Sequence, residues 1–183
     1  MYRILPLALI LAACSGAEPR YLIDTPVQAG SARLRVATLE VREVSLPAYA
    51  EASEILLEGE DGGLTQIDNA LWADDPSRAV TLAIADHIGR ASTATVAAEP
   101  WPLEEDAQAA VQVTVAQMVA RADGTVALSG QYAISSYDRV VRERIERFAI
   151  SVPLAEATPA GIAQATGAAI AQLSGEITAR LSR

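Results

Sequence analysis

Lysine is absent from this sequence, and cysteine and histidine occur once each. All 14 basic residues are arginines, and 23 acidic residues bring the formal net charge to -9. Nucleic-acid binding needs concentrated positive charge against the phosphates, so an acidic chain without a basic cluster is excluded from that class. One cysteine excludes a disulfide within the chain. With a single histidine beside it, too few ligands remain for a Cys/His zinc site.

Catalytic motifs are absent as well. The sequence has no phosphate-binding loop, dinucleotide fingerprint or Gly-x-Ser-x-Gly turn. His87 follows Asp86 in a predicted helix, and a catalytic role would need a nucleophile or a metal held nearby. We instead predict a histidine on the helix surface or partly buried. The acidic run Glu104-Glu105-Asp106 predicts a solvated loop. The sequence therefore predicts no enzyme, no cofactor and no metal site.

A long apolar run is missing too. The apolar run from Ile4 to Leu11 would reach only about 12 Å as a helix, against about 30 Å for a bilayer core. Arg3 before it and small residues after it are typical of a secretory signal peptide. The end, Leu11-Ala12-Ala13-Cys14, resembles the lipobox of bacterial lipoproteins. The alternative, an incidental apolar cysteine, is weakened because the only cysteine falls where a lipobox requires one.

The lipobox resemblance implies cleavage between Ala13 and Cys14 and diacylation of the Cys14 thiol. Residues 1–13 would be the signal peptide, and residues 14–19 the acylated cysteine with a short tether. Ser15 is not the Asp that resembles an inner-membrane retention signal, which implies a lipid anchor in the outer membrane, on its periplasmic face. Five extended residues reach about 17 Å, so we expect a domain of residues 20–183 to lie close to that membrane.

The first half of the domain carries patterns of short strands and one helix. Alternating residues predict a strand over 33–41 with a change of phase near Ala37, after a first strand beginning at Tyr21. We expect a connector over 45–53 and a hairpin around the Gly/Asp cluster 59–63. A helix is predicted to begin at Pro76 with Asp74 or Asp75 as its cap, and to end at Gly89.

The second half predicts an antiparallel sheet followed by a long helix. Strands are expected over 93–97, 111–116 and 126–134, with a hairpin turn at Asp123-Gly124 and a bulge or close packing at Gly130. Residues 139–148 fit either a helix or a strand, and we favour a strand that begins irregularly. Thr158 is predicted to cap the last helix, whose buried stripe is Ile162, Thr166, Ala169/Ile170, Leu173, Ile177 and Leu181.

This order predicts a single α/β domain, with a mixed, largely antiparallel sheet and two main helices packed on one face. The length of 183 residues and the hydrophobic content of 51% suit one core, because two smaller domains would bury little surface each.

One segment ahead of the first predicted helix carries a family resemblance. Trp72-Ala73-Asp74-Asp75-Pro76 resembles the Trp-Ala-(Asp/Glu)-Pro motif of the auxiliary lipoproteins of ABC-type intermembrane transport systems, with one extra acidic residue. The hairpin around Ala122-Asp123-Gly124, the small-residue helix from Ala165 to Ile177 and the lipobox are similar to the same family. At the positions of the middle hairpin where aromatic residues are usual in the family, this sequence has Met118 and Tyr132, and the non-aromatic Met118 is the departure.

The resemblance implies a non-enzymatic lipoprotein that docks or stabilises a periplasm-spanning partner with a mammalian-cell-entry (MCE) domain. It further implies lipid transport, membership of a homo-oligomer and a structural role for Trp72, Asp74, Asp75 and Pro76. Candidate interface residues are Trp101, between two prolines, and Ala165, Ala169 and Leu173, which allow close approach along the last helix. For each, packing within the chain is the alternative.

Two other functions remain as alternatives. An envelope scaffold regulating a peptidoglycan synthase would ordinarily need a long disordered tether, which the five residues 15–19 do not supply. A small periplasmic hydrolase would need a convergent polar site, and the sequence shows none.

Overall fold

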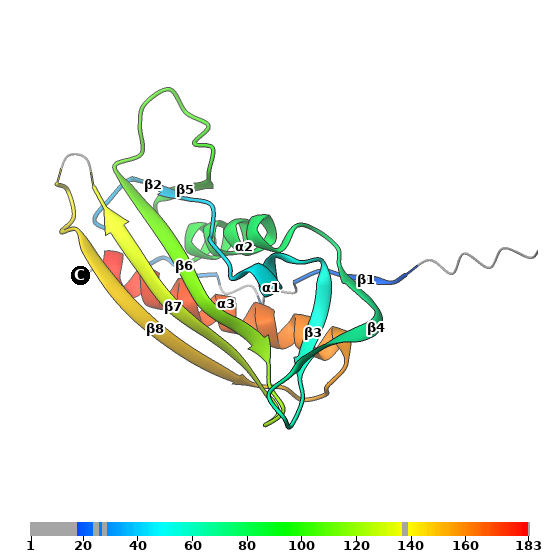
Figure 1. Ribbon diagram of the computed structural model, residues 1–183. Coiled ribbons are helices and arrows are strands. Elements are labelled where there is room, and N and C mark those ends of the chain that lie inside the picture. Colours follow the sequence, from blue (N-terminus) through cyan, green and yellow to red (C-terminus); the bar gives the residue numbers. More distant parts are fainter. Residues whose placement is uncertain (1–17, 24–25, 27–28, 137–138, 183) are drawn as a thin grey trace, which may run out of the picture.

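The computed structural model describes residues 18–23, 26, 29–136 and 139–182. Within them the chain forms an open, eight-stranded, mostly antiparallel sheet and three helices, two of them long (Figure 1). This confirms the predicted mixed α/β fold. The strands are β1 (Arg20–Tyr21), β2 (Thr38–Val41), β3 (Glu54–Glu58), β4 (Leu64–Trp72), β5 (Thr95–Ala98), β6 (Ala109–Ala120), β7 (Thr125–Ser135) and β8 (Arg144–Pro153). The helices are α1 (Ala48–Glu51), α2 (Pro76–Ala91) and α3 (Pro159–Leu181).

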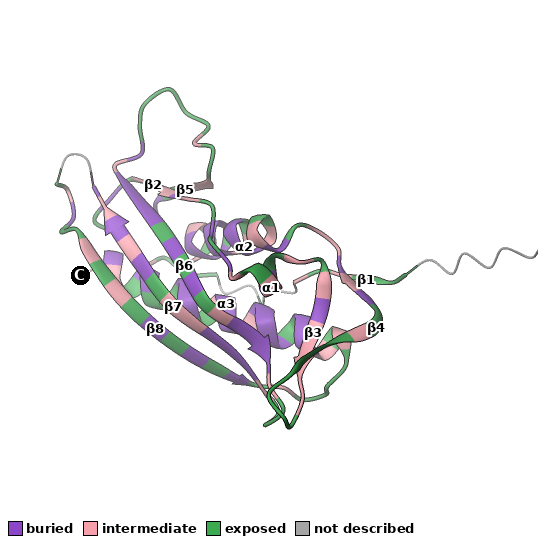
Figure 2. Cartoon of the chain, viewed as in Figure 1, coloured by how far each residue is buried: buried purple, intermediate pink, exposed green. Residues whose placement is uncertain are grey.

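The strands β6, β7 and β8 form a long antiparallel meander, which Figure 1 shows as three adjacent ribbons with the two long helices behind them. Valines on the inner face of β6 and the alternate residues Phe148, Ile150 and Val152 of β8 are buried, while residues between them face solvent. Figure 2 shows this alternation as purple and green bands along β8. The period of two therefore places one sheet face in the core.

Two glycines shape this meander. Gly124 has φ +77°, a left-handed conformation that lets Asp123-Gly124 turn the chain between β6 and β7. At Gly130 the pairing register shifts between Val115 and Gln117, and a β-carbon there would lie 2.2 Å from the carbonyl oxygen of Thr114. Both the predicted hairpin and the predicted close packing are confirmed.

The long helices begin where the sequence predicts. The Asp75 carboxylate accepts a hydrogen bond from the Arg78 N–H at 2.9 Å, and the Thr158 hydroxyl accepts one from the Gly161 N–H at 3.1 Å. The predicted end of α2 at Gly89 is wrong. Gly89 does not adopt a left-handed conformation, and the helix continues to Ala91. A glycine inside a helix costs only about 1 kcal/mol, which packing readily outweighs.

Three further boundaries differ from the sequence prediction. The strand expected over 33–41 is reduced to β2. The predicted change of phase near Ala37 is present, because the buried residues are Leu34 and Val36 before Ala37 and Leu39 and Val41 after it. The connector expected over 45–53 contains the short helix α1. The second strand of the predicted hairpin around 59–63 is β4, which extends to Trp72. The ambiguous segment 139–148 leads into a strand that begins at Arg144, as favoured.

The core lies between the inner sheet face and the two long helices, which also contact each other. The predicted stripe of α3 is buried throughout, from Ile162 to Leu181. Burial of these aliphatic side chains at roughly 25 cal/mol per Å² is the main stabilisation of the fold.

Candidate functional site

The resemblance motif lies where β1, β4 and α2 meet. Trp72 is the last residue of β4 and pairs in register with Tyr21 of β1. Its backbone N–H donates to the Ser53 carbonyl at 2.7 Å, and the N–H of Ala73 donates to the Tyr21 carbonyl at 2.8 Å. The Trp72 side chain is 7% exposed and belongs to the core. The motif thus joins the first strand of the domain to the start of its first long helix.

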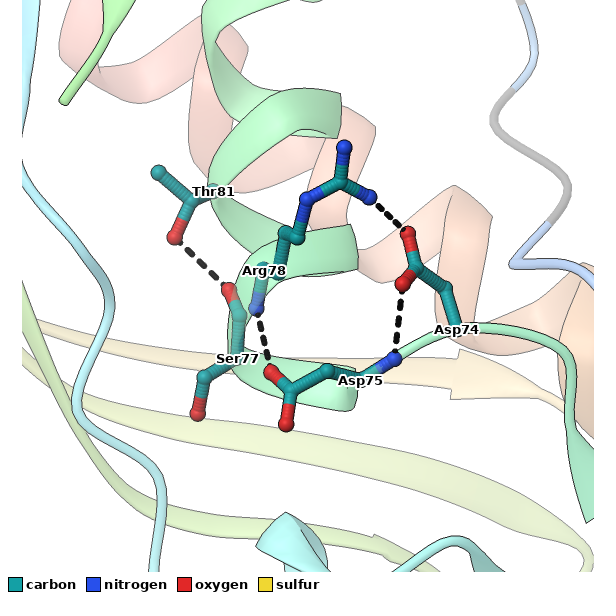
Figure 3. A network of polar contacts seen from close by, with 5 residues as sticks. All are labelled: Asp74, Asp75, Ser77, Arg78 and Thr81. Carbon is teal, nitrogen blue, oxygen red and sulfur yellow. Dashed lines mark hydrogen bonds and ion pairs between the residues drawn. The ribbon is translucent and has the colours of Figure 1, made fainter. Parts of the chain in front are cut away.

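The two aspartates of the motif have separate contacts, which Figure 3 shows. Asp75 caps the helix, as described above. Asp74 accepts the N–H of Asp75 at 2.9 Å and forms an ion pair with the guanidinium of Arg78. Both carboxylates therefore stabilise the start of α2, and they do not contact each other as a pair of catalytic acid and base would.

Thr81, one turn further along α2, ties the helix to the segment before α1. Its hydroxyl donates to the Ser77 carbonyl at 2.7 Å and accepts the N–H of Val44 at 2.9 Å. Thr81 is 3% exposed, so these two hydrogen bonds satisfy a buried hydroxyl that water does not reach. Sequence reasoning missed this contact. A threonine within an apolar helix stripe was the only local signal for it.

A small cavity lies beside Trp72. It has a volume of about 30 Å³ and is lined by residues of α1, β3, β6 and α3 that include Tyr49, Met118 and Ile162. Sites for small-molecule ligands are roughly 300–1,000 Å³. This cavity has room for about two water molecules and is too small for a lipid chain or a substrate.

The loop between β5 and β6 projects from the edge of the molecule, away from β1 (Figure 1). Its only tryptophan, Trp101, is half-buried, and the indole N–H donates to the Glu105 carbonyl at 2.7 Å. The acidic residues 104–106 are exposed, as predicted, and Leu103 is 53% exposed. Trp101 therefore holds the loop in shape while an apolar side chain next to it faces solvent.

The base of the loop is fixed to β2 by Gln108. The Gln108 side-chain carbonyl accepts the N–H of Ala37 at 2.7 Å, and its backbone N–H donates to the Thr38 hydroxyl at 2.9 Å. At the other end of the loop the N–H of Glu99 donates to the Val41 carbonyl at 2.8 Å, so both ends are anchored to β2. A surface that keeps its shape loses less conformational entropy on binding a partner.

His87 is more buried than the sequence predicts. Its side chain is 6% exposed, and its Nε2 has no hydrogen-bond partner among the described residues. Burial lowers the pKa of His87 below its usual value, Asp86 opposes that shift, and Arg90 adds to it. His87 is buried because α2 contacts both α3 and β5, so that side chains outside the single apolar stripe of the helix are also covered. No cluster of three or more metal-ligating side chains occurs in the described part of the chain.

The small-residue face of α3 is used within the chain. Ala165 is 7% exposed, and Ala169 and Leu173 are fully buried in the core. Their expected role at an interface between copies is therefore corrected. The small side chains of these residues bring α3 close to its own sheet and to α2.

Cys14, which is expected to carry the lipid, and Ala13, which is expected to precede the signal cleavage site, lie outside the described residues. The described chain is fixed in the fold from Pro19, whose carbonyl accepts the N–H of Leu71 at 3.4 Å. Among the helices described, none combines the length and apolarity needed to cross a bilayer.

Comparisons with known proteins give a family and a fold. A family model described as the ABC-type transport auxiliary lipoprotein component matches residues 21–178. The crystal structure of an uncharacterized protein, 18% identical, aligns with a TM-score of 0.68 over 85% of this chain and 98% of that one. A DUF330 protein from Xanthomonas campestris, 14% identical, has a TM-score of 0.69 over 87% and 92% of the two chains. No curated protein matches the sequence.

Proposed function

The chain belongs to the family of ABC-type transport auxiliary lipoprotein components, and on that premise we propose that it is a non-enzymatic outer-membrane lipoprotein of an MCE-type lipid transport system. It would dock or stabilise the periplasm-spanning MCE partner at the outer membrane and act as a homo-oligomer. The observation that carries the proposal is the family match over residues 21–178, which spans the whole described domain apart from its ends.

The position of the first strand supports attachment close to a membrane. Because β1 begins at Arg20, only five residues separate it from Cys14, a reach of about 17 Å. β1 pairs with the end of β4, so the motif around Trp72 lies where the tether enters the fold. An acyl anchor on Cys14 would hold this end of the domain against the bilayer.

The loop carrying Trp101 is the part of the domain we propose for docking the MCE protein. It projects away from β1 and hence away from the proposed anchor (Figure 1). It also combines the exposed Leu103 with the exposed acidic residues 104–106 that follow it, and interfaces pair apolar contacts with polar ones in this way. Tethering raises the effective concentration of docking partners, so a modest intrinsic affinity suffices.

Two variants test the anchor. Cys14→Ser should abolish acylation and give an uncleaved or soluble form, measured by palmitate labelling and membrane fractionation. Ser15→Asp keeps the cysteine and should move the lipoprotein to the inner membrane wherever the retention rule of enteric bacteria applies. A Cys14→Ser protein that fractionates with the outer membrane and complements normally would contradict the anchor.

Docking is tested by measuring binding of the chain from Ser15 onward to the MCE protein encoded beside it. Leu103→Arg changes the exposed part of the loop without touching the Trp101 bond, and we expect it to weaken binding. Leu64→Arg is the matched control, because Leu64 is a similarly exposed leucine at the β3–β4 hairpin. Absence of binding by the unaltered chain would refute the MCE partner. Binding to a peptidoglycan synthase instead would favour the scaffold alternative.

A further inference from the structure

The most exposed large apolar side chain of the described residues is that of Leu22, at 71%. It follows β1 directly, and the two-residue alternation of the strand sets its direction: Tyr21 packs against the core, whereas Arg20 and Leu22 face solvent. A single exposed leucine is ordinary on a protein surface. This one lies eight residues after Cys14, so it stays within about 27 Å of the proposed anchor.

A hollow of about 440 Å³ lies beside Leu22. Tyr21 and Leu22 line one side of it, and the turn before α3 with the first turns of that helix, within residues 155–164, lines the other. Glu156 is the only charged residue of this lining, although the whole chain has a formal net charge of -9. The hollow is therefore weakly charged, and most of its lining side chains are small or neutral.

The turn that forms the far side of the hollow is held in place by its own contacts. The N–H of Leu154 donates to the Gly124 carbonyl at 2.8 Å, and Thr158 caps α3 through the N–H of Gly161. Gly161 also packs so closely that a β-carbon there would lie 2.2 Å from the Glu156 carbonyl oxygen. The hollow therefore keeps its shape, and little conformational entropy is lost when it meets another surface.

We propose that Arg20, Leu22 and the hollow beside them lie directly on the phospholipid surface of the membrane that carries the anchor. Leu22 inserts among the acyl chains, because an apolar side chain gains free energy when it leaves water. Arg20 lies on the same side of the strand, and its guanidinium stays at the level of the lipid phosphates. The inference rests on the anchor in the proposed function and names the residues of the domain that touch lipid.

Chain length and charge together favour lipid as the occupant of this surface. The short tether keeps Leu22 within reach of the bilayer at all times. An anionic leaflet repels an acidic chain, and that repulsion is weaker where the facing surface carries few acidic groups. The acidic residues 104–106 lie on the loop that projects away from β1 (Figure 1). Burial of one leucine favours the domain lying on the membrane over a domain lifted on its tether by roughly tenfold or more.

The experiment imposes the anchor chemically. The chain from Cys14 onward retains every described residue, and its only cysteine is coupled to a maleimide-bearing lipid in vesicles of phosphatidylethanolamine and phosphatidylglycerol. Leu22→Trp adds an indole at the proposed contact, and a share of the vesicle lipids carries bromine on the acyl chains, which quenches an indole that it touches. After subtraction of the emission of the unaltered chain, we expect the added indole to emit at shorter wavelength and to lose most of its intensity.

Two controls are matched to this measurement. Leu103→Trp places the indole at another exposed leucine, on the loop that projects away from β1, and bromine should not quench it. Arg20→Glu, added to Leu22→Trp, opposes the lipid phosphates and should reduce the quenching. Arg90→Glu makes the same charge change on α2 and should leave the quenching unchanged. Circular dichroism melting of each variant shows that it is folded.

Absence of bromine quenching in Leu22→Trp overturns the lipid contact, and equal quenching of Leu103→Trp does so too, because the domain then has no preferred orientation. An indole at position 22 that is shielded from iodide but not quenched by bromine is covered by the tether or by a second copy, which also overturns the contact. Quenching that persists with Arg20→Glu overturns the role of Arg20 alone. The coupling replaces the natural acyl chains, so these results overturn only this inference, whereas the fractionation of Cys14→Ser decides the anchor itself.

Discussion

Replacing Trp72 by alanine tests the packing of the motif at the start of α2. The indole is 7% exposed and borders the cavity of about 30 Å³ beside Met118 and Ile162. Removing it would merge the vacated space with that cavity, and each additional Å³ costs roughly 24 cal/mol. For a buried aromatic deletion of this kind the expected loss is about 3–5 kcal/mol. That is a large share of the roughly 5–15 kcal/mol that stabilises a domain.

For a chain of this length the loss corresponds to a fall in Tm of about 6–20 °C. Circular dichroism melting of Trp72→Ala and of the unaltered chain measures it. The matched control is Trp101→Ala, because Trp101 is half-buried in a loop and makes one hydrogen bond, to the Glu105 carbonyl. That variant should lose only about 0.5–1.5 kcal/mol for the bond, together with a small packing contribution.

Fluorescence separates the two indoles, since the chain has only two tryptophans. Trp101→Ala leaves Trp72 as the only emitter, and we expect blue-shifted emission that resists quenching by iodide. Trp72→Ala leaves the half-exposed Trp101, which should be quenched. A Tm for Trp72→Ala within about 2 °C of the unaltered chain, or a readily quenched Trp72, would refute the packing argument.

Three further predictions follow from single contacts. Asp75→Ala should lower the free energy of unfolding in urea by about 0.5–2 kcal/mol, because it removes the cap of α2. Asp74→Ala should lower it by less than about 0.5 kcal/mol, since the ion pair of Asp74 with Arg78 is exposed. Equal losses would contradict the assignment of Asp75 as the helix cap. Burial lowers the pKa of His87 in the folded chain, so the unfolded chain binds the proton at a higher pH than the folded chain does. The stability of the fold should therefore fall as the pH drops below about 6.5 and level off below the folded pKa. His87→Gln should reduce this fall in Tm, and a variant with an unchanged pH profile would disprove the role of His87. Gly130→Ala places a β-carbon 2.2 Å from the carbonyl oxygen of Thr114 and should destabilise the fold by about 1–3 kcal/mol. Gly175→Ala meets open space on α3 and should stabilise the fold by roughly 0.5–1 kcal/mol. Changes in Tm of the same sign for both variants would contradict the different surroundings of the two glycines.

The elements of this protein were largely predictable from the sequence where their signals are local. The turn at Asp123-Gly124, the caps at Asp75 and Thr158 and the alternation in β6 each depend on a few neighbouring residues. A positive φ, a free helix N–H or a two-residue period needs no distant partner, so a short segment specifies it.

The tertiary structure decided what depends on distant partners. β6 pairs with β7 on one edge, and with β2 and β3 at opposite ends of the other edge, an order that no local pattern encodes. His87 is buried because α2 packs against more than one element, and Ala165 and Ala169 are buried because α3 lies close to its own sheet. Pairing between segments far apart in the chain is set by the summed burial of the whole core, and a residue's own neighbours in sequence do not determine it.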